Sequence, residues 1–337
     1  MPRQTPELWR SRGLLAVLLL PLSGLFGLLA ALRRTAFRCG LMRPQRLPVP
    51  VIVVGNISVG GSGKTPVVDW LVRQLREAGY RPGVVSRGYG SKVAGVAILP
   101  DNPDAAIHGD EPVLLARLTG CPVAIGADRP DAGRALLAAH PECDVIVSDD
   151  GMQHYRLARD VEIAVLDEAT LGNGFLLPAG PLREPLSRLR AVDLVIAHGP
   201  LSPRLQAVLP AAGSRRMSLR GGEFVALGGS GGRCGVSAFA GRRVHALAGI
   251  GRPERFFAQL RALGLDVVPH PFPDHHPFVA ADLDFAPGEP KVMTSKDAVK
   301  CASFAPADTW EFPVSAHIEA GAAETILEKL RHGRQTA

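Results

Sequence analysis

Runs of consecutive apolar residues recur along the chain, each followed by a turn and then by a stretch with helical periodicity. Strands that are apolar throughout are typical of parallel sheets buried on both faces. This alternation predicts an α/β fold built on a doubly wound, mostly parallel sheet. The expected strands are Val51–Gly55, Gly83–Ser86, Val123–Gly126, Asp144–Ser148, Glu162–Asp167 and Asp193–Ala197, and the expected helices are Val67–Ala78, Glu111–Leu118 and Ala132–Ala139.

A second, smaller α/β set follows a segment rich in glycine and serine at residues 215–235, which indicates a hinge or hairpin. We therefore expect four parts: an N-terminal membrane helix with basic flanks (1–47), a core lobe (48–214), the hinge (215–235) and a smaller C-terminal lobe (236–337). The strands expected after the hinge are Val244–Gly249, Asp266–Pro269 and Lys291–Thr294, and the helices are Glu254–Leu263 and Ile318–Leu330.

The segment Gly13–Leu32 has no charged residue, and ten of its twenty residues are leucine. A helix of this length reaches about 30 Å, the thickness of a bilayer's hydrocarbon core. A spanning or deeply embedded helix is the preferred interpretation, although Pro21 and Gly24 leave open a helix that lies in the interface or re-enters. A cleaved signal peptide is disfavoured because Arg33 and Arg34 follow at once, where a small-residue cleavage site would be needed.

Composition and charge change this picture only at the N-terminus. The chain has 337 residues and a formal net charge of +6. Its hydrophobic fraction of 46% excludes a disordered or fibrous protein. Residues 1–46 hold eight arginines and one acidic residue, so this segment carries +7 and the remainder −1. No nucleic-acid partner is needed to explain the basicity. More arginines follow the apolar run than precede it, which places the bulk of the protein in the cytoplasm. The five cysteines are scattered, which favours neither disulfides nor a zinc site.

A glycine-rich loop joins the strand at Val51–Gly55 to the first expected helix. Its end, Gly-Lys-Thr at 63–65, predicts a P-loop NTPase-like sheet that binds a nucleotide. In such a loop, backbone N–H groups and the helix N-terminus surround the phosphates, Lys64 reaches the β- and γ-phosphates, and the Thr65 hydroxyl holds Mg²⁺. Ser58 stands where the usual pattern has its first glycine. The expected nucleotide-binding residues are Ser58, Val59, Gly60, Gly61, Ser62, Gly63, Lys64 and Thr65.

Two adjacent acids, Asp149 and Asp150, end an apolar strand and are candidates for the second metal position. Adjacent carboxylates repel each other unless a cation lies beside them. A turn capped before Gly151 is the alternative reading, and it weakens once a P-loop lies in the same sheet.

Seven motifs in order make the chain resemble the tetraacyldisaccharide 4'-kinases, the membrane-bound lipid A 4'-kinases of Gram-negative bacteria. A serine or threonine at the position of Ser58 is usual in that family, whereas Ser295 replaces its usual glutamate. The motifs are VGNISVGGSGKTP (54–66), SRGYG (86–90), GDEP (109–112), SDDGMQH (148–154), LPAGPLREP (177–185), FPDHHPF (272–278) and TSKDAVK (294–300).

The resemblance implies transfer of the ATP γ-phosphate to the 4'-hydroxyl of a tetraacylated disaccharide 1-phosphate, giving lipid IVA. It implies that Asp110 accepts the hydroxyl proton with His275 as its partner, and that Arg183 and Glu184 line the site. Because Asp110 and His275 are expected in different lobes, lobe closure would assemble the pair.

Each of these residues also has a purely structural interpretation. Asp110 also reads as a helix N-cap, His275 as a surface residue, and Arg183 with Glu184 as a local ion pair. Tyr89 and Asn56 are weaker candidates for substrate contact. Lys296 and Asp297 are expected only to close a strand.

Two other functions compete with the kinase. A membrane-anchored P-loop ATPase switch would hydrolyse ATP without a phosphorylated lipid product, and a scaffold with a vestigial P-loop would need no catalysis. GTP is disfavoured because Thr294–Asp297 places its lysine one position too late for the guanine-specific pattern. The expected partners are a lipid substrate and the membrane surface, with a monomer favoured.

Overall fold

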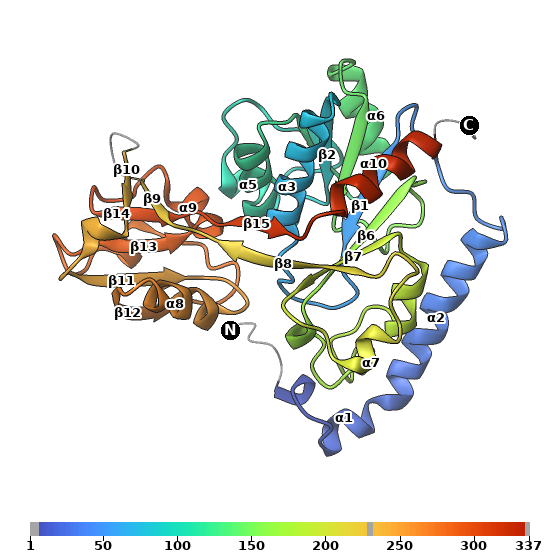
Figure 1. The fold of residues 1–337 in the computed structure, drawn as a ribbon, viewed down its shortest axis with the longest axis horizontal. Helices are drawn as coiled ribbons and strands as arrows, with labels where there is room; N and C mark the ends of the chain where they lie inside the picture. The colour runs from blue at the N-terminus through green and yellow to red at the C-terminus, as the bar shows by residue number, and fades with distance from the viewer. Residues whose placement is uncertain (1–6, 228–231, 334–337) are drawn as a thin grey trace.

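The computed structural model describes residues 7–227 and 232–333, so residues 1–6 of the basic segment and 228–231 of the glycine-rich segment lie outside it. Two sheets organise the chain (Figure 1), the larger with nine strands in the order β15-β8-β7-β6-β1-β5-β2-β4-β3. All its neighbouring strands pair in parallel except the outermost strand at each edge. The prediction of a doubly wound, mostly parallel sheet is confirmed.

Helices on the two faces of the larger sheet bury two hydrophobic cores. The central strands are buried along their whole length, as their apolar runs predicted. The strands are β1 (Val51–Gly55), β2 (Pro82–Ser86), β3 (Ala97–Ile98), β4 (Val123–Ile125), β5 (Val145–Asp149), β6 (Val161–Leu166), β7 (Leu194–His198) and β8 (Ser214–Arg220); the helices are α3 (Lys64–Glu77), α4 (Ala105–His108), α5 (Asp110–Thr119), α6 (Arg129–Ala139) and α7 (Pro203–Gln206), with the 3-10 turns η2 (Glu168–Thr170) and η3 (Leu186–Ala191).

The smaller sheet has six strands in the order β10-β9-β14-β13-β11-β12, around a core of its own that is rich in phenylalanine. Its elements are β9 (Glu223–Ala226), β10 (Arg233–Gly235), η4 (Val236–Phe239), β11 (Arg243–Ala248), α8 (Pro253–Ala262), β12 (Asp266–Pro271), η5 (Ala280–Leu283), β13 (Lys291–Thr294), α9 (Ser295–Cys301) and β14 (Thr309–Phe312). All five cysteines of the chain are free.

The end of the chain returns to the larger sheet. β15 (Ser315–Ile318) pairs with β8, and α10 (Ala322–Gly333) contacts α3, β6 and β7. The expected helix Ile318–Leu330 therefore begins four residues too early, because Ile318 ends a strand. The expectation that all of 236–337 belongs to the smaller lobe is also wrong for this segment. Two strands, β8 and β15, thus lie side by side where the chain passes between the sheets (Figure 1).

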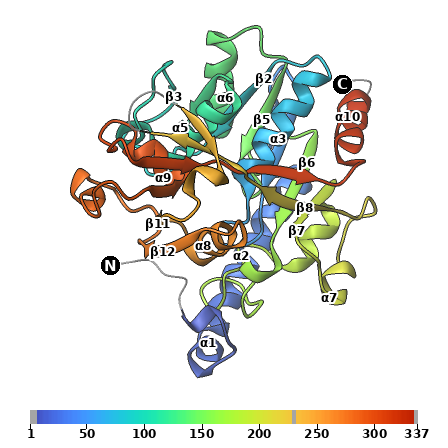
Figure 2. The same cartoon turned by 60° about the vertical axis from the view of Figure 1, so that its left-hand side comes forward.

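Direct ion pairs also join the two parts. Arg252 and Arg255, at the start of α8, pair with Asp167 at the end of β6, and Arg117 of α5 pairs with Glu311 of β14. Asp167 is only 2% exposed, so these arginines neutralise a carboxylate that has almost no access to water. In Figure 2, α9 of the smaller lobe lies next to α5 of the larger one, and the two helices are in contact.

The N-terminal segment forms η1 (Glu7–Trp9), α1 (Leu14–Leu18) and α2 (Leu20–Arg38), which run along the outside of the larger lobe (Figure 1). On one face of α2, the Ser23 hydroxyl donates to the backbone oxygen of Leu176 at 2.9 Å. The opposite face carries an exposed leucine stripe: Leu25, Leu28, Leu29 and Leu32, each more than half exposed. Within residues 7–227 and 232–333, no helix is both long enough and apolar enough to span a membrane.

Candidate active site

The loop after β1 has the backbone that an anion-binding loop needs. Gly60 and Gly63 adopt φ values of 108° and 87°, which side chains other than glycine rarely tolerate. A Cβ at Gly60 or Gly61 would meet no atom within 4 Å, so this part of the loop faces open space. Lys64 then begins α3, whose amphipathic face is buried against the sheet. Backbone N–H groups of the loop and the helix terminus can therefore approach phosphate oxygens closely.

Contacts on the other side of the loop hold its shape. The Asn56 side chain donates to the Gly60 oxygen at 3.3 Å and to the Ser62 hydroxyl at 3.1 Å. The Ser58 hydroxyl lies 2.9 Å from Thr170, and the Val59 N–H donates to the Pro181 oxygen at 2.8 Å. The Ser58 hydroxyl and the Val59 N–H are thus engaged in contacts within the protein that stabilise the loop. Asn56, a weak sequence candidate for substrate contact, braces the loop.

Asp149 and Asp150 lie beside this loop but differ in electrostatics. Asp150 is 3.3 Å from Lys64 Nζ and 3.0 Å from Arg183 Nη1. Burial acts to raise the pKa of Asp150, but the charges of Lys64 and Arg183 outweigh it and hold the pKa well below its usual range. For Asp149, burial together with the charge of Glu111 raises the pKa to about 7. The nearby cations thus outweigh burial at Asp150, whereas at Asp149 burial outweighs the charges of Lys64 and Arg129.

Asp149 fits a metal ion. Its Oδ1 atom is buried and has no hydrogen-bond partner among the described residues. Such an atom is costly unless a cation or a donor meets it. Thr65 occupies the first turn of α3, where its hydroxyl can serve the same ion. Across the described ranges no three His, Cys, Asp or Glu side chains form a metal cluster by themselves, so nucleotide oxygens and water would have to complete the coordination.

Asp110 begins α5 of the larger lobe and His275 lies in the loop after β12 of the smaller lobe, yet the two side chains meet. His275 Nδ1 lies 3.0 Å from Asp110 Oδ2, and the His275 backbone has φ 60°. Burial acts to raise the pKa of Asp110, but the hydrogen bond with His275 and the charge of Lys296 outweigh it, so the pKa is lower than usual. Asp110 is therefore ionised at neutral pH and can accept a proton. Tyr89 stacks against His275 with ring centroids 4.9 Å apart.

Lys296 is the residue that sequence reasoning underrated. It does not close a strand: it lies in the first turn of α9, and its Nζ is 3.2 Å from Glu111 and 3.3 Å from His275 Nε2. Burial acts to lower the pKa of Lys296, but Glu111, Asp110 and Asp274 outweigh it and raise the pKa. Lys296 thus ties α9 of the smaller lobe to α5 of the larger one. Its place just after β13, within the motif TSKDAVK (294–300), was the available signal.

Arg183 and Glu184 diverge, although they are adjacent in sequence. Arg183 turns toward Asp150, whereas Glu184 is 4% exposed and accepts from Gln153 at 2.9 Å and Tyr155 at 2.5 Å. Arg34 of α2 lies 3.6 Å from Glu184. Gln153 also contacts Arg183, at 3.4 Å. A line of polar contacts therefore runs from the N-terminal helix to Asp150.

Comparison with known proteins agrees with this geometry. The family model for tetraacyldisaccharide-1-P 4'-kinase matches residues 15–331. The chain is 70% identical to a tetraacyldisaccharide 4'-kinase of Aromatoleum aromaticum, over 100% of both chains. It is 68% identical to one from Azoarcus sp., over 98% of this chain and 97% of that one. A crystal structure of LpxK from Aquifex aeolicus, described as an "apo" form in complex with ATP, superposes with a TM-score of 0.78 at 30% identity, covering 94% of this chain and 100% of that one. The match along nearly the whole length, together with the loop and the paired acids, shows that the chain belongs to the tetraacyldisaccharide 4'-kinase family.

Proposed function

We propose that this protein transfers the γ-phosphate of ATP to the 4'-hydroxyl of a tetraacylated disaccharide 1-phosphate, which forms lipid IVA in lipid A biosynthesis. The observation that carries the proposal is a pair of half-sites at the first residues of α3 and α5, two helices that are in contact. Lys64 with Asp150 marks the phosphate end, and Asp110 with His275 supplies a proton acceptor at the other. Phosphoryl transfer requires both, because charge must be neutralised while the hydroxyl is deprotonated in line.

Each residue has a proposed role in this reaction. Backbone N–H groups of residues 60–65 hold the phosphates, and Lys64 and Arg183 stabilise the charge that develops on the transferred group. Asp110 accepts the hydroxyl proton, and His275 orients the carboxylate through its 3.0 Å hydrogen bond. Glu184 acts indirectly: its carboxylate positions the Gln153 side chain and does not contact a reacting atom.

Thr65, Asp149 and Asp150 are proposed to hold Mg²⁺ with the nucleotide. The ion neutralises charge on the β- and γ-phosphates when it is bound. Asp149 supports this assignment because its Oδ1 atom is buried without a hydrogen-bond partner among the described residues. Binding a cation would offset the energetic cost of leaving that oxygen unpaired. Asp150 then contributes through Lys64, whose Nζ it positions at 3.3 Å.

Lobe closure, the monomeric state and attachment to the membrane are also part of the proposal. The two sheets act as lobes that close on the substrates, and the chain bends where it passes from β8 to β9 and from β14 to β15. The segment 215–235, expected as the hinge, supplies β8 to the larger sheet and β9 and β10 to the smaller one. The protein works as a monomer on the cytoplasmic face of the inner membrane, where its lipid substrate lies. The leucine stripe of α2 supports membrane attachment, because four half-exposed leucines in one stripe are costly in water.

Membrane attachment gives a direct prediction. Replacing Leu25, Leu28 and Leu32 with serine is expected to weaken partition into phosphatidylcholine vesicles by about 100-fold, since each half-exposed leucine contributes about 1 kcal/mol when it enters lipid. Vesicle flotation measures the partition. Val279→Ser is the matched control, because Val279 is equally exposed, at 54%, but lies on the smaller lobe. An unchanged partition of the triple variant would rule out attachment through this stripe.

The activity itself is tested by incubating the full chain with γ-labelled ATP and the 1-phosphorylated acceptor in mixed micelles. The label is expected in a lipid product that now carries two phosphates. A membrane-anchored ATPase switch would instead release the label as inorganic phosphate, with or without acceptor. Release into water alone would therefore reject the kinase and favour the switch.

A further inference from the structure

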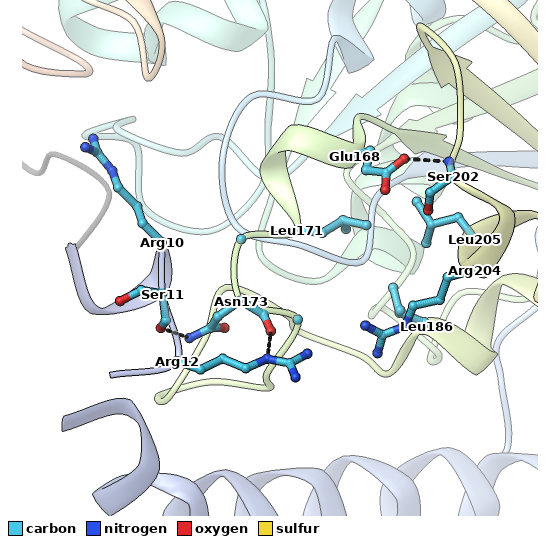
Figure 3. Close-up of a pocket in the computed structure, with 12 residues that line it drawn as sticks. Arg10, Ser11, Arg12, Glu168, Leu171, Asn173, Leu186, Ser202, Arg204 and Leu205 are labelled. Atoms are coloured by element: carbon cyan, nitrogen blue, oxygen red, sulfur yellow. Dashed lines mark hydrogen bonds between the residues drawn. The ribbon is translucent and has the colours of Figure 1, made fainter. Parts of the chain in front are cut away.

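A pocket of about 310 Å³ opens between the N-terminal segment and the larger lobe (Figure 3). Its wall is formed by residues 10–12, by the loop that follows β6 and by the start of α7. The proposed reaction uses none of these residues. Three of the lining side chains are arginines, Arg10, Arg12 and Arg204, and the one acid among them is Glu168.

The positive charge of this pocket is not cancelled within it. Glu168 already accepts a hydrogen bond from the Ser202 N–H at 2.8 Å, on the side of the pocket away from Arg12. Arg12 uses its Nε to donate to the Asn173 oxygen at 3.2 Å and stacks over Phe175 at 5.3 Å. Its terminal nitrogens make no hydrogen bond or ion pair with another described residue, so they can serve a ligand. Figure 3 shows the guanidinium groups of Arg12 and Arg204 directed to the same edge of the pocket, while Arg10 points away from it.

The pocket is distinct from the place of phosphoryl transfer. Its walls are tied to the beginning of α2, where Ser23 contacts the backbone of Leu176, whereas Arg34 reaches the catalytic side through Glu184. Eleven residues of helix between Ser23 and Arg34 correspond to about 16 Å. The pocket also lies behind η2, whose Thr170 faces the P-loop through Ser58.

Apolar residues on α1 flank the basic edge. Leu14, Leu15 and Leu18 follow Arg12 directly and are 77%, 57% and 66% exposed. Cations placed next to exposed leucines match the boundary of a bilayer, where phosphates lie just above the acyl chains. A soluble anion would explain the arginines but not the leucines beside them.

We propose that this pocket binds the phosphate of an anionic phospholipid, with Arg12 and Arg204 as the donors and Arg10 at the rim. The proposal rests on the membrane attachment proposed above and adds a headgroup site to it. A guanidinium fork presents parallel N–H groups to two phosphate oxygens, so two converging arginines can hold one phosphate with defined geometry. The ligand is a lipid that anchors the enzyme and is not consumed.

The test titrates the full chain, in neutral detergent, with dihexanoyl phosphatidylglycerol below its micelle concentration. The wild type is expected to show one saturable site in calorimetry, and dihexanoyl phosphatidylcholine is expected to show none. Arg12→Gln with Arg204→Gln is expected to weaken phosphatidylglycerol binding by at least about tenfold. Arg12→Lys with Arg204→Lys should stay weak, because lysine keeps the charge but lacks the fork.

Arg38→Gln with Arg43→Gln is the matched control. It removes the same amount of charge, here from the N-terminal basic segment that also holds Arg12, and neither side chain makes a hydrogen bond or ion pair with another described residue, so binding should persist. Equal losses in both double variants would mean general attraction to anions and would overturn the proposal. Arg204→Gln alone guards against misfolding, since unchanged ATP binding with weakened lipid binding shows an intact protein.

A last arm separates the headgroup from the acceptor. In neutral micelles the KM for the 1-phosphorylated acceptor should be the same in the Arg12/Arg204 variant as in the wild type. A raised KM with unaltered phosphatidylglycerol binding would assign the pocket to the acceptor's own phosphate and reject the proposal. The leucine variant of α2 can lose its partition into vesicles and still bind phosphatidylglycerol in this pocket. The proposal of membrane attachment through the leucines and the proposal of a headgroup site can therefore fail independently.

Discussion

Asp110→Asn is expected to lower kcat for lipid phosphorylation by about 10²- to 10⁴-fold, the range that a positioned general base contributes. Asparagine has the same shape and can still hydrogen-bond to His275, but it cannot accept the hydroxyl proton. The KM for ATP should change little, because Asp110 lies with the smaller lobe's His275 and not in the P-loop. Steady-state kinetics with varied ATP and saturating acceptor separates the two constants.

Asp104→Asn serves as the control, since Asp104 caps the neighbouring helix α4 through a role that asparagine also performs. His275→Ala provides a second readout. The hydrogen bond from His275 lowers the pKa of Asp110, so its loss raises that pKa and the acidic limb of the pH–rate profile should move to higher pH. A profile that stays in place, or an Asp110→Asn variant with full kcat, would remove Asp110 from the role of base.

Lys64→Ala is expected to lower kcat by about 10²- to 10³-fold, as loss of one preorganised cation at a developing charge does in other enzymes. The KM for ATP should rise as well, because Lys64 is proposed to contact phosphate oxygens in the ground state. Without Lys64, Asp150 loses one of the two cations that hold its pKa low. Nucleotide binding by calorimetry and phosphoryl transfer by label incorporation measure the two effects.

Lys92→Ala is the matched control, because Lys92 is an exposed lysine of the same lobe and makes only a backbone contact in the described part of the chain. Lys64→Arg should not restore activity, since a planar guanidinium does not fit the place of a compact ammonium group. If Lys64→Ala kept its function, the P-loop would be vestigial and the scaffold interpretation would be favoured.

Local sequence was enough for the features that depend on local physics. The central strands are apolar throughout because both faces are covered, so their runs could be located within a residue or two. The P-loop was predictable because its backbone demands glycine at Gly60 and Gly63. The pair Asp110 and His275 came only from the resemblance, since 165 residues separate them and no periodicity links them.

The features that the sequence did not predict depend on contacts between residues that are far apart along the chain. Ile318 was assigned to a helix because its apolar character suits a helix or an edge strand equally, and only the pairing with Met217 decides. Lys296 was underrated because Glu111, its nearest acid, lies 185 residues away. Twenty uncharged residues predicted one long helix, whereas the chain breaks at Leu19 between α1 and α2.

The contact between Arg34 and Glu184 bears on how this enzyme is to be made soluble. Removing residues 1–47 would take away the leucines, but it would also leave Glu184 with one cation fewer in a nearly dry environment. Glu184 holds Gln153, and Gln153 contacts Arg183. Kinetic measurements on a shortened enzyme would therefore reflect a less firmly held Arg183, the proposed phosphate-binding arginine, as well as the loss of the proposed membrane anchor. Kinetics measured on it would describe a different site from that of the intact protein.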